Sequence, residues 1–251
     1  MIQVIVPFYN CLPWIARCLY SLERQQGCQY RVFVADDCST DGSSDVARAL
    51  CASYGYWYYR NETNIKCPHN IVNAITMAGP DPEAIIYILD GDDHLTHEHS
   101  LKYIQDQYDN DPNLWLAYGR YQPVPYDGGC QPAGLYPDRV IRGRSFRHYP
   151  TNMFNHPLTF KTWLYDRLER ADFCDKNGNW FLTGYDRVLM YPLLEMATRD
   201  DRVFWKCLDE VTYSYNSINM NSEAVLQLPT DNADDIYHYK VKDVAWRADS
   251  L

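Results

Sequence analysis

The chain has 251 residues, of which 46% are hydrophobic. This length and composition suffice for one α/β domain with a sizeable core and argue against wholesale disorder. Its 33 acidic and 23 basic side chains give a formal charge of −10 without a basic stripe, which excludes nucleic acid as the main partner. The apolar runs are too short to span a membrane, and a strand-like segment begins almost at Met1, where a signal peptide would stand. Nine scattered cysteines without a Cys-x-x-Cys pair disfavour a zinc site and favour a reducing, cytoplasmic location.

Strand and helix signals alternate along the first hundred residues. In chain order, the pattern predicts a strand at 2–8, a helix over 14–22, a strand at 31–35, a helix from Val46, a strand at 56–59, a helix over 71–77 and a strand at 85–89. This alternation indicates a Rossmann-like, mostly parallel sheet flanked by helices. Ligands of such sheets bind at the carboxyl ends of the strands, and three of these four strands end in polar or acidic clusters.

The second half of the chain is less regular. Residues 118–157 are rich in Pro, Gly, Tyr and Arg and predict a long loop region, followed by a strand-to-helix segment at 158–168 and a helix over 186–196. We expect a single domain with a nucleotide-sugar-binding half at 1–117 and an acceptor and catalytic half at 118–229. A tail at 230–251 follows, which the pattern does not place.

An acidic cluster, Asp90-Gly91-Asp92-Asp93, follows the apolar strand at 85–89. Its carboxylates emerge together at the sheet edge and repel one another unless a cation lies among them. Hard oxygen ligands of this kind suit Mg²⁺ or Mn²⁺, which can in turn hold a diphosphate. The structural alternative is an acidic turn with Gly91 at a tight bend.

A second polar cluster, Asp36 to Ser43, follows the strand at 31–35. A carboxylate at the end of a buried strand can accept the imide N–H of a uracil or thymine ring, and we assign this role to Asp37. Helix capping by Ser39, Thr40 or Asp41 is the structural alternative.

Three segments in order carry a family resemblance: Val4-Ile5-Val6-Pro7-Phe8-Tyr9-Asn10, then the cluster from Asp36 to Ser43, then Leu89-Asp90-Gly91-Asp92-Asp93. Together they resemble glycosyltransferase family 2 over the first hundred residues. The resemblance implies a GT-A fold and an inverting, Mn²⁺- or Mg²⁺-dependent transfer of one sugar. The implied donor is a UDP- or dTDP-linked sugar, and the implied acceptor is a hydroxyl of a glycan or another molecule.

The resemblance also implies roles for single residues. Pro7 and Tyr9 would line the base pocket, Asp37 would contact the base, Asp90 would contact the ribose, and Asp92 with Asp93 would bind the divalent cation. The family often has Arg-Asn where this chain has His69-Asn70. In place of that Arg, Lys66 or His69 would contact the diphosphate. Lys66 and Asn70 are the candidate nucleotide-sugar-binding residues of this segment.

The second half resembles the family at two points. Gly184-Tyr185-Asp186 matches the start of a late helix in which an Asp, often preceded by Glu, acts as general base; here Tyr185 replaces that Glu. A carboxylate favoured by the helix dipole is the structural alternative for Asp186. His156-Pro157 resembles a segment that passes beneath the donor sugar in some relatives, although His156 is equally typical of a loop histidine.

The one basic run is formed by Arg139, Arg142, Arg144 and Arg147. It predicts either a solvated loop face or a clamp on a diphosphate or an anionic acceptor. Two rival functions remain beside the transferase. One is a glycan- or nucleotide-binding module without turnover. The other is a sugar nucleotidyltransferase, which should carry a Gly-rich loop after the first strand, where this chain has Pro7-Phe8-Tyr9-Asn10.

Overall fold

The computed structural model describes residues 1–125, 129–130, 133–199 and 202–219, and the tail at 230–251 lies outside them. One sheet of eight strands runs through both halves of the chain, in the order β3-β2-β1-β4-β7-β6-β10-β5. The strands of this sheet are β1 (Ile2–Phe8), β2 (Tyr30–Asp36), β3 (Trp57–Arg60), β4 (Ile85–Ile88), β5 (His94–Leu95), β6 (Leu116–Val124), β7 (Leu158–Lys161) and β10 (Trp205–Asn216). A separate antiparallel pair consists of β8 (Thr198–Arg199) and β9 (Arg202–Val203).

Most strands of the large sheet point the same way. β1 pairs in parallel with β2 and β4, β2 pairs in parallel with β3, and β6 pairs in parallel with β10. Only β7 and the short β5 run against their neighbours. The carboxyl ends of β1, β2, β4, β6 and β10 therefore meet at one edge, which confirms the predicted α/β class with a mostly parallel sheet.

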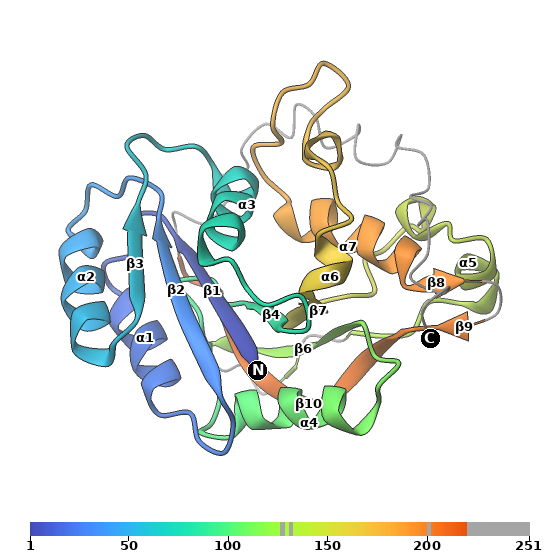
Figure 1. Cartoon of the computed structure of the whole chain (residues 1–251), viewed down its shortest axis with the longest axis horizontal. Helices are drawn as coiled ribbons and strands as arrows, with labels where there is room; N and C mark the ends of the chain where they lie inside the picture. The colour runs from blue at the N-terminus through green and yellow to red at the C-terminus, as the bar shows by residue number, and fades with distance from the viewer. Residues whose placement is uncertain (126–128, 131–132, 200–201, 220–251) are drawn as a thin grey trace.

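Helices cover both faces of the sheet. They are α1 (Ile15–Glu23), α2 (Ser43–Tyr54), α3 (Cys67–Ala78), α4 (Ser100–Asn110), α5 (Asp138–Arg142), α6 (Thr162–Tyr165) and α7 (Tyr185–Met196), with 3₁₀ turns η1 (Phe146–His148) and η2 (Arg170–Phe173). Figure 1 shows α1 and α2 on the opposite side of β1 and β2 from α3. Side chains of β1 alternate between the two faces, since Val4 and Val6 pack with α1 and α2 whereas Ile5 packs with α3 and α7.

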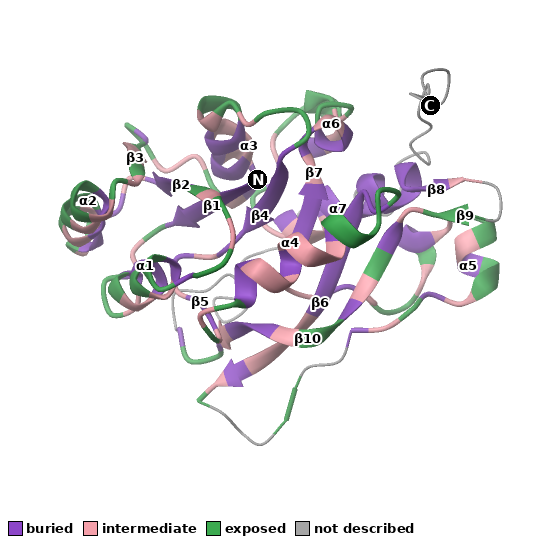
Figure 2. Ribbon diagram, turned by 60° about the horizontal axis from the view of Figure 1, so that its bottom comes forward, coloured by how far each residue is buried: buried purple, intermediate pink, exposed green. Residues whose placement is uncertain are grey.

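Burial follows the pattern expected of a sheet covered on both sides. Every residue of β1 and β4 is buried, and Figure 2 shows these central strands in purple, with exposed residues on the outer sides of α2 and α5. The predicted first helix is confirmed: its apolar positions Ile15, Cys18, Leu19 and Leu22 are buried in α1. No helix among the described residues has both the length and the apolar character required to cross a bilayer.

Two regions differ from the prediction. The long loop expected at 118–157 is wrong in its first part, because β6 continues to Val124 despite Pro123, and α5 and η1 follow further on. The twelve-residue strand β10 was not predicted. Register shifts between Cys207 and Tyr213 interrupt its pairing with β6, so its buried residues do not alternate regularly.

Candidate active site

A cavity of about 510 Å³ lies at the edge of the sheet where the parallel strands end. Its walls come from the ends of β1, β2, β4, β6 and β10, from the segment before β7, and from the first turns of α3 and α7. Most of the residues proposed from sequence line it: Pro7, Tyr9, Asp37, Lys66, Asn70, Asp90, Asp92, His156 and Asp186. Residues from both halves of the chain thus meet in one site.

Asp37, directly after β2, is buried and organises the loop that follows β3. Its carboxylate accepts hydrogen bonds from the Asn61 side chain and from the backbone N–H groups of Ile65 and Lys66, each at 2.9 Å. Lys66 itself has a positive φ of 72°, so these bonds hold an unfavourable backbone conformation at the cavity wall. Asp37 therefore shapes this wall as well as lining it.

Asn61, which the sequence analysis missed, links the residues of this wall to one another by hydrogen bonds. Its amide nitrogen donates to Asp37 and, at 2.8 Å, to the side-chain oxygen of Asn70, while its own oxygen accepts from Asn73. Asn70 in turn donates to the backbone carbonyl of Ala35 at 3.1 Å. The side-chain amide of Asn70 is thus hydrogen-bonded within the protein. For Asn61, the only signal in the sequence is its position directly after β3.

His69 does not line the cavity. Its ring stacks on Trp180, with the centroids 3.9 Å apart and the planes 6° from parallel, and the Arg170 guanidinium lies 5.8 Å from the centre of the Trp180 ring. Burial, followed by the Arg170 charge, lowers the pKa of His69. This contact joins α3 to the segment before α7. Because His69 is used in it, Lys66 is the basic side chain on this wall of the cavity.

The acidic cluster forms a tight turn against the end of β1. The Asp93 N–H donates to the Asp90 carbonyl at 2.9 Å, and the Gly91 N–H donates to the Pro7 carbonyl at 3.0 Å. A Cβ atom at Gly91 would lie 2.5 Å from the Cβ of Phe8, closer than two such atoms can approach. Glycine is required here by the approach of the turn to β1.

We expect Gly91→Ala to lower the free energy of unfolding by about 1–3 kcal/mol, because neither the turn nor β1 can move without disturbing the sheet. Thermal unfolding should show a fall of a few degrees for a chain of this size. A melting temperature equal to that of the wild type would contradict the close packing seen here.

Asp90 accepts hydrogen bonds from Tyr185, the residue that stands where the family with the resembling motifs often has Glu. The Tyr185 hydroxyl lies 2.9 and 2.8 Å from the two carboxylate oxygens, and Nε2 of His156 lies 3.8 Å from one of them. Burial, reinforced by the charge of Asp90, raises the pKa of Tyr185 well above its usual value, so the hydroxyl stays protonated and donates. Tyr185 thereby ties the first turn of α7 to the acidic turn.

Asp92 and Asp93 point in different directions. Asp92 lines the cavity and accepts a hydrogen bond from the Asn219 side chain at 2.7 Å. Asp93 is 1% exposed and does not line the cavity, since its two oxygens accept from the Tyr213 hydroxyl and the Asn216 N–H, both at 2.6 Å. The structure therefore brings only the first of the two proposed metal ligands to the cavity.

The acidic turn fits a divalent cation with few protein ligands. Among the described residues, no three His, Cys, Asp or Glu side chains form a group that could enclose a metal ion. Mg²⁺ and similar ions commonly take one or two carboxylates and complete their shell with water and substrate phosphates. Burial raises the pKa of Asp92, and burial with the charges of Asp92 and Asp90 raises that of Asp93. A cation at the cavity face would relieve this repulsion.

His156 faces the same cavity from a cis peptide bond to Pro157. Its ring stacks on Tyr213 with the centroids 4.5 Å apart, and its Nδ1 atom is buried without a hydrogen-bond partner among the described residues. Burial lowers the pKa of His156 to about 4. The imidazole is therefore neutral at physiological pH and offers polar contacts without charge.

Asp186 is the second residue of α7, a helix that begins directly after Gly184, whose φ is 70°. It lines the cavity, and no side chain of the described residues donates to its carboxylate. Burial raises the pKa of Asp186 above its usual value, while the Arg187 charge and the N–H groups of the helix end act in the opposite direction. A half-buried carboxylate of raised basicity, open to a cavity, is suited to accept a proton.

The basic run does not form a clamp at this site. None of its four arginines lines the cavity, Arg139 and Arg142 are exposed, and Arg147 is buried against Glu195 of α7.

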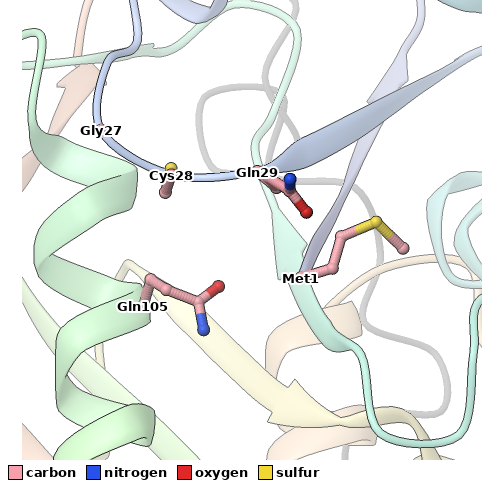
Figure 3. Close-up of a pocket in the computed structure, with 5 residues that line it drawn as sticks. All are labelled: Met1, Gly27, Cys28, Gln29 and Gln105. Atoms are coloured by element: carbon pink, nitrogen blue, oxygen red, sulfur yellow. The ribbon is translucent and has the colours of Figure 1, made fainter.

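A second hollow, of about 540 Å³, lies at the opposite end of β1. Figure 3 shows the five residues that line it: Met1, Gly27, Cys28, Gln29 and Gln105. It presents amide and sulfur groups but no acidic or basic side chain. The cavity with the acidic turn is therefore the candidate active site.

The chain is similar to known proteins in sequence and in fold. The family model described as glycosyl transferase family 2 matches residues 3–194. A curated relative, the uncharacterized protein MT1568 of Mycobacterium tuberculosis, is 28% identical over 118 residues, which cover 47% of this chain and 35% of the relative.

Solved structures share the fold at low sequence identity. TarS of S. aureus is similar with a TM-score of 0.62 and 19% identity, over 90% of this chain and 38% of TarS. A TarS 1-349 structure in complex with UDP-GlcNAc has a TM-score of 0.55 and 18% identity, over 86% of this chain and 58% of that one.

The mannosyltransferase PcManGT of Pyrobaculum calidifontis, in complex with GDP-Man and Mn²⁺, has a TM-score of 0.59 and 17% identity, over 98% of this chain and 66% of PcManGT. The chain spans about a third of the length of the curated relative and of TarS. Its fold is of the GT-A type, as the resemblance implied. The family match covers well over half of the sequence, and the chain belongs to glycosyl transferase family 2.

Proposed function

We propose that this protein is a metal-dependent, inverting glycosyltransferase that moves one sugar from a UDP- or dTDP-linked donor to an acceptor hydroxyl. The observation that carries the proposal is that Asp92 and Asp186 line one cavity together with the wall formed by Asp37, Lys66 and Asn70, called here the Asp37 wall. That arrangement supplies a nucleotide wall, an anionic turn for a cation and a basic carboxylate. The structures of TarS with UDP-GlcNAc and of PcManGT with GDP-Man and Mn²⁺ support it by likeness of fold.

The donor would lie along the carboxyl edge of the sheet. The base would contact Pro7, Tyr9 and Asp37, and the diphosphate would extend past Lys66 toward Asp92. Asp90, oriented by Tyr185, would accept a hydrogen bond from the ribose. Neutral His156 would face the donor sugar without repelling the positive charge that develops at its anomeric carbon.

Asp186 would act as the general base. It would take the proton of the acceptor hydroxyl as that oxygen attacks the anomeric carbon from the face opposite the diphosphate, which inverts the configuration. Asp92 would hold a divalent cation, whose chemical contribution is to offset the negative charge on the leaving diphosphate. The access of Asp186 to the cavity favours catalysis over the rival binding module.

The proposal is tested by thermal unfolding with UDP, dTDP, GDP and CMP, each with and without Mn²⁺. A nucleotide at a hundred times its dissociation constant stabilises the fold by about 2.7 kcal/mol, a shift of several degrees at this size. We expect a Mn²⁺-dependent shift with UDP or dTDP, and its loss in Asp92→Asn. The exposed Asp45 on α2 supplies the matched control, since Asp45→Asn should keep the full shift.

The same experiment shows whether Asp92→Asn is folded. Because burial raises the pKa of Asp92, its ionised form opposes folding above that pKa, and the neutral variant without metal should melt no lower than the wild type at pH 7. A shift with GDP alone would change the donor class. The absence of any shift, together with absent release of sugar from UDP- and dTDP-linked donors, would favour the binding module.

A further inference from the structure

Two tyrosines stand side by side in the cavity on neighbouring strands of the second half. Tyr121 lies on β6 and Tyr215 on β10, which pair in parallel. Their ring centroids are 4.8 Å apart and their planes 39° from parallel. Both residues are half-buried and line the cavity, so the pair presents an aromatic surface to whatever occupies it.

The hydroxyl groups of this pair are available to a ligand. Neither has a hydrogen-bond partner among the described residues. Burial raises the pKa of both tyrosines, and the charges of Asp93, Asp90 and Asp92 raise that of Tyr215 further. Each hydroxyl is therefore protonated at neutral pH, and each can both donate and accept a hydrogen bond.

The pair lies beside the acidic turn, at the end of the cavity away from the wall that Asp37 shapes: Asp93 of the turn accepts the N–H of Asn216, the residue after Tyr215. In the sheet, β6 is two positions from β4 and three from β1, and β10 is one position further. At a strand spacing of about 4.8 Å, Tyr121 lies roughly 14 Å across the sheet from the end of β1. A donor base held between the ends of β1 and β2 therefore leaves the tyrosines uncovered.

We propose that Tyr121 and Tyr215 form the acceptor platform and that the acceptor is a carbohydrate whose pyranose ring stacks on them. This inference rests on the proposed function. A pyranose presents a face of C–H groups that packs on aromatic rings and an edge of hydroxyls that meets the two phenol groups. An acyclic polyol lacks such a face, and the pair offers no charge for an anionic acceptor.

The step balances within the proposed reaction. An oxygen of the stacked sugar forms a bond to the anomeric carbon of the donor, the bond from that carbon to the diphosphate breaks, and the electron pair leaves with the diphosphate. The proton of the attacking hydroxyl passes to Asp186. The platform holds the acceptor and takes no part in bond making.

The test measures transfer from the donor that binds in the thermal assay to methyl glycosides of glucose, galactose, mannose and N-acetylglucosamine, with glycerol as an acyclic acceptor. Product is identified by mass, and release of the donor sugar to water is measured without acceptor. We expect transfer to at least one pyranoside. In Tyr121→Leu the KM for that acceptor should rise about tenfold, the effect of one lost ring contact, with hydrolysis of the donor within twofold of wild type.

Two further variants separate stacking from folding. Tyr121→Phe keeps the ring and should retain most of the affinity for the acceptor. Tyr54→Leu alters a tyrosine pair outside the cavity, in which Tyr54 and Tyr56 lie 5.6 Å apart, and should change neither reaction.

Three outcomes would overturn the inference: transfer to glycerol but to no pyranoside, hydrolysis of the donor with no transfer to any acceptor in the panel, or equal loss of transfer and hydrolysis in Tyr121→Leu. A protein that neither binds nor hydrolyses a donor would instead refute the proposed function itself.

Discussion

Replacing Asp186 with asparagine is expected to slow sugar transfer by a factor of about 10²–10⁴, the contribution of a well-placed general base. Asparagine preserves the size of the side chain but cannot accept the proton of the acceptor hydroxyl. Binding of the nucleotide should be unchanged, because the Asp37 wall and Asp92 come from other segments of the chain. The kcat for transfer and the thermal shift with nucleotide and Mn²⁺ measure the two effects separately.

The pH dependence of transfer provides a second measure of the same role. Catalysis needs ionised Asp186, and burial raises its pKa, so the rate should fall as the pH drops through a value above the ordinary aspartate range. His156, with a pKa of about 4, adds no ionisation between pH 5 and 8.

Asp45, in the first turn of α2, is the matched control for a helix-terminal carboxylate, and Asp45→Asn should transfer sugar at the wild-type rate. A variant of Asp186 that keeps more than about a tenth of the wild-type rate would be inconsistent with general-base catalysis, which contributes at least a hundredfold.

The first hundred residues could be predicted because local pattern and tertiary structure agree there. β1 and β4 are central strands buried on both faces, so they are uniformly apolar, and each ends where its polar cluster begins. The helix predicted over 71–77 begins earlier, at Cys67, because Pro68 is compatible with a first helical turn. Parallel pairing then brings the strand ends to one edge, which is why motifs distant in sequence indicated one site.

The second half could not be predicted in the same way. β10 takes its place beside β6 through long-range pairing, and its irregular register removes the alternation by which a strand is recognised. The aromatic pair of Tyr121 and Tyr215 exists only through that pairing. Composition counted 22 tyrosines without indicating which of them line a cavity.

The sequence also could not predict that Asp92 and Asp93 point in different directions. Both follow the same strand, and either can serve a cation by its chemistry. The backbone N–H of Asn216 and the hydroxyl of Tyr213, more than a hundred residues away, engage Asp93. Only the folded position of β10 decides which carboxylate remains at the cavity.

Breaking the buried ion pair between Arg147 and Glu195 is expected to have the largest effect on stability. Arg147 is 6% exposed and Glu195 is fully buried. The guanidinium donates from Nε to one carboxylate oxygen at 2.5 Å and from Nη2 to the other at 3.1 Å, and it lies 5.9 Å from the centre of the Tyr191 ring. The pair fastens η1 to α7, the helix whose first turn carries Asp186.

Arg147→Met should destabilise the fold by about 3–5 kcal/mol, because the Glu195 carboxylate is left buried without its main partner. For a chain of this size, the loss corresponds to a fall in melting temperature of roughly 6–20 °C. Adding Glu195→Met removes the stranded charge, and apolar replacement of a buried pair is often neutral, so the double variant should recover more than half of the lost stability. Arg139→Met, in the same basic run but exposed, should leave the melting temperature unchanged within about 1–2 °C. A small effect of Arg147→Met, or a double variant as unstable as the single one, would mean that the pair does not anchor α7 and that Asp186 is positioned by the packing of the helix alone.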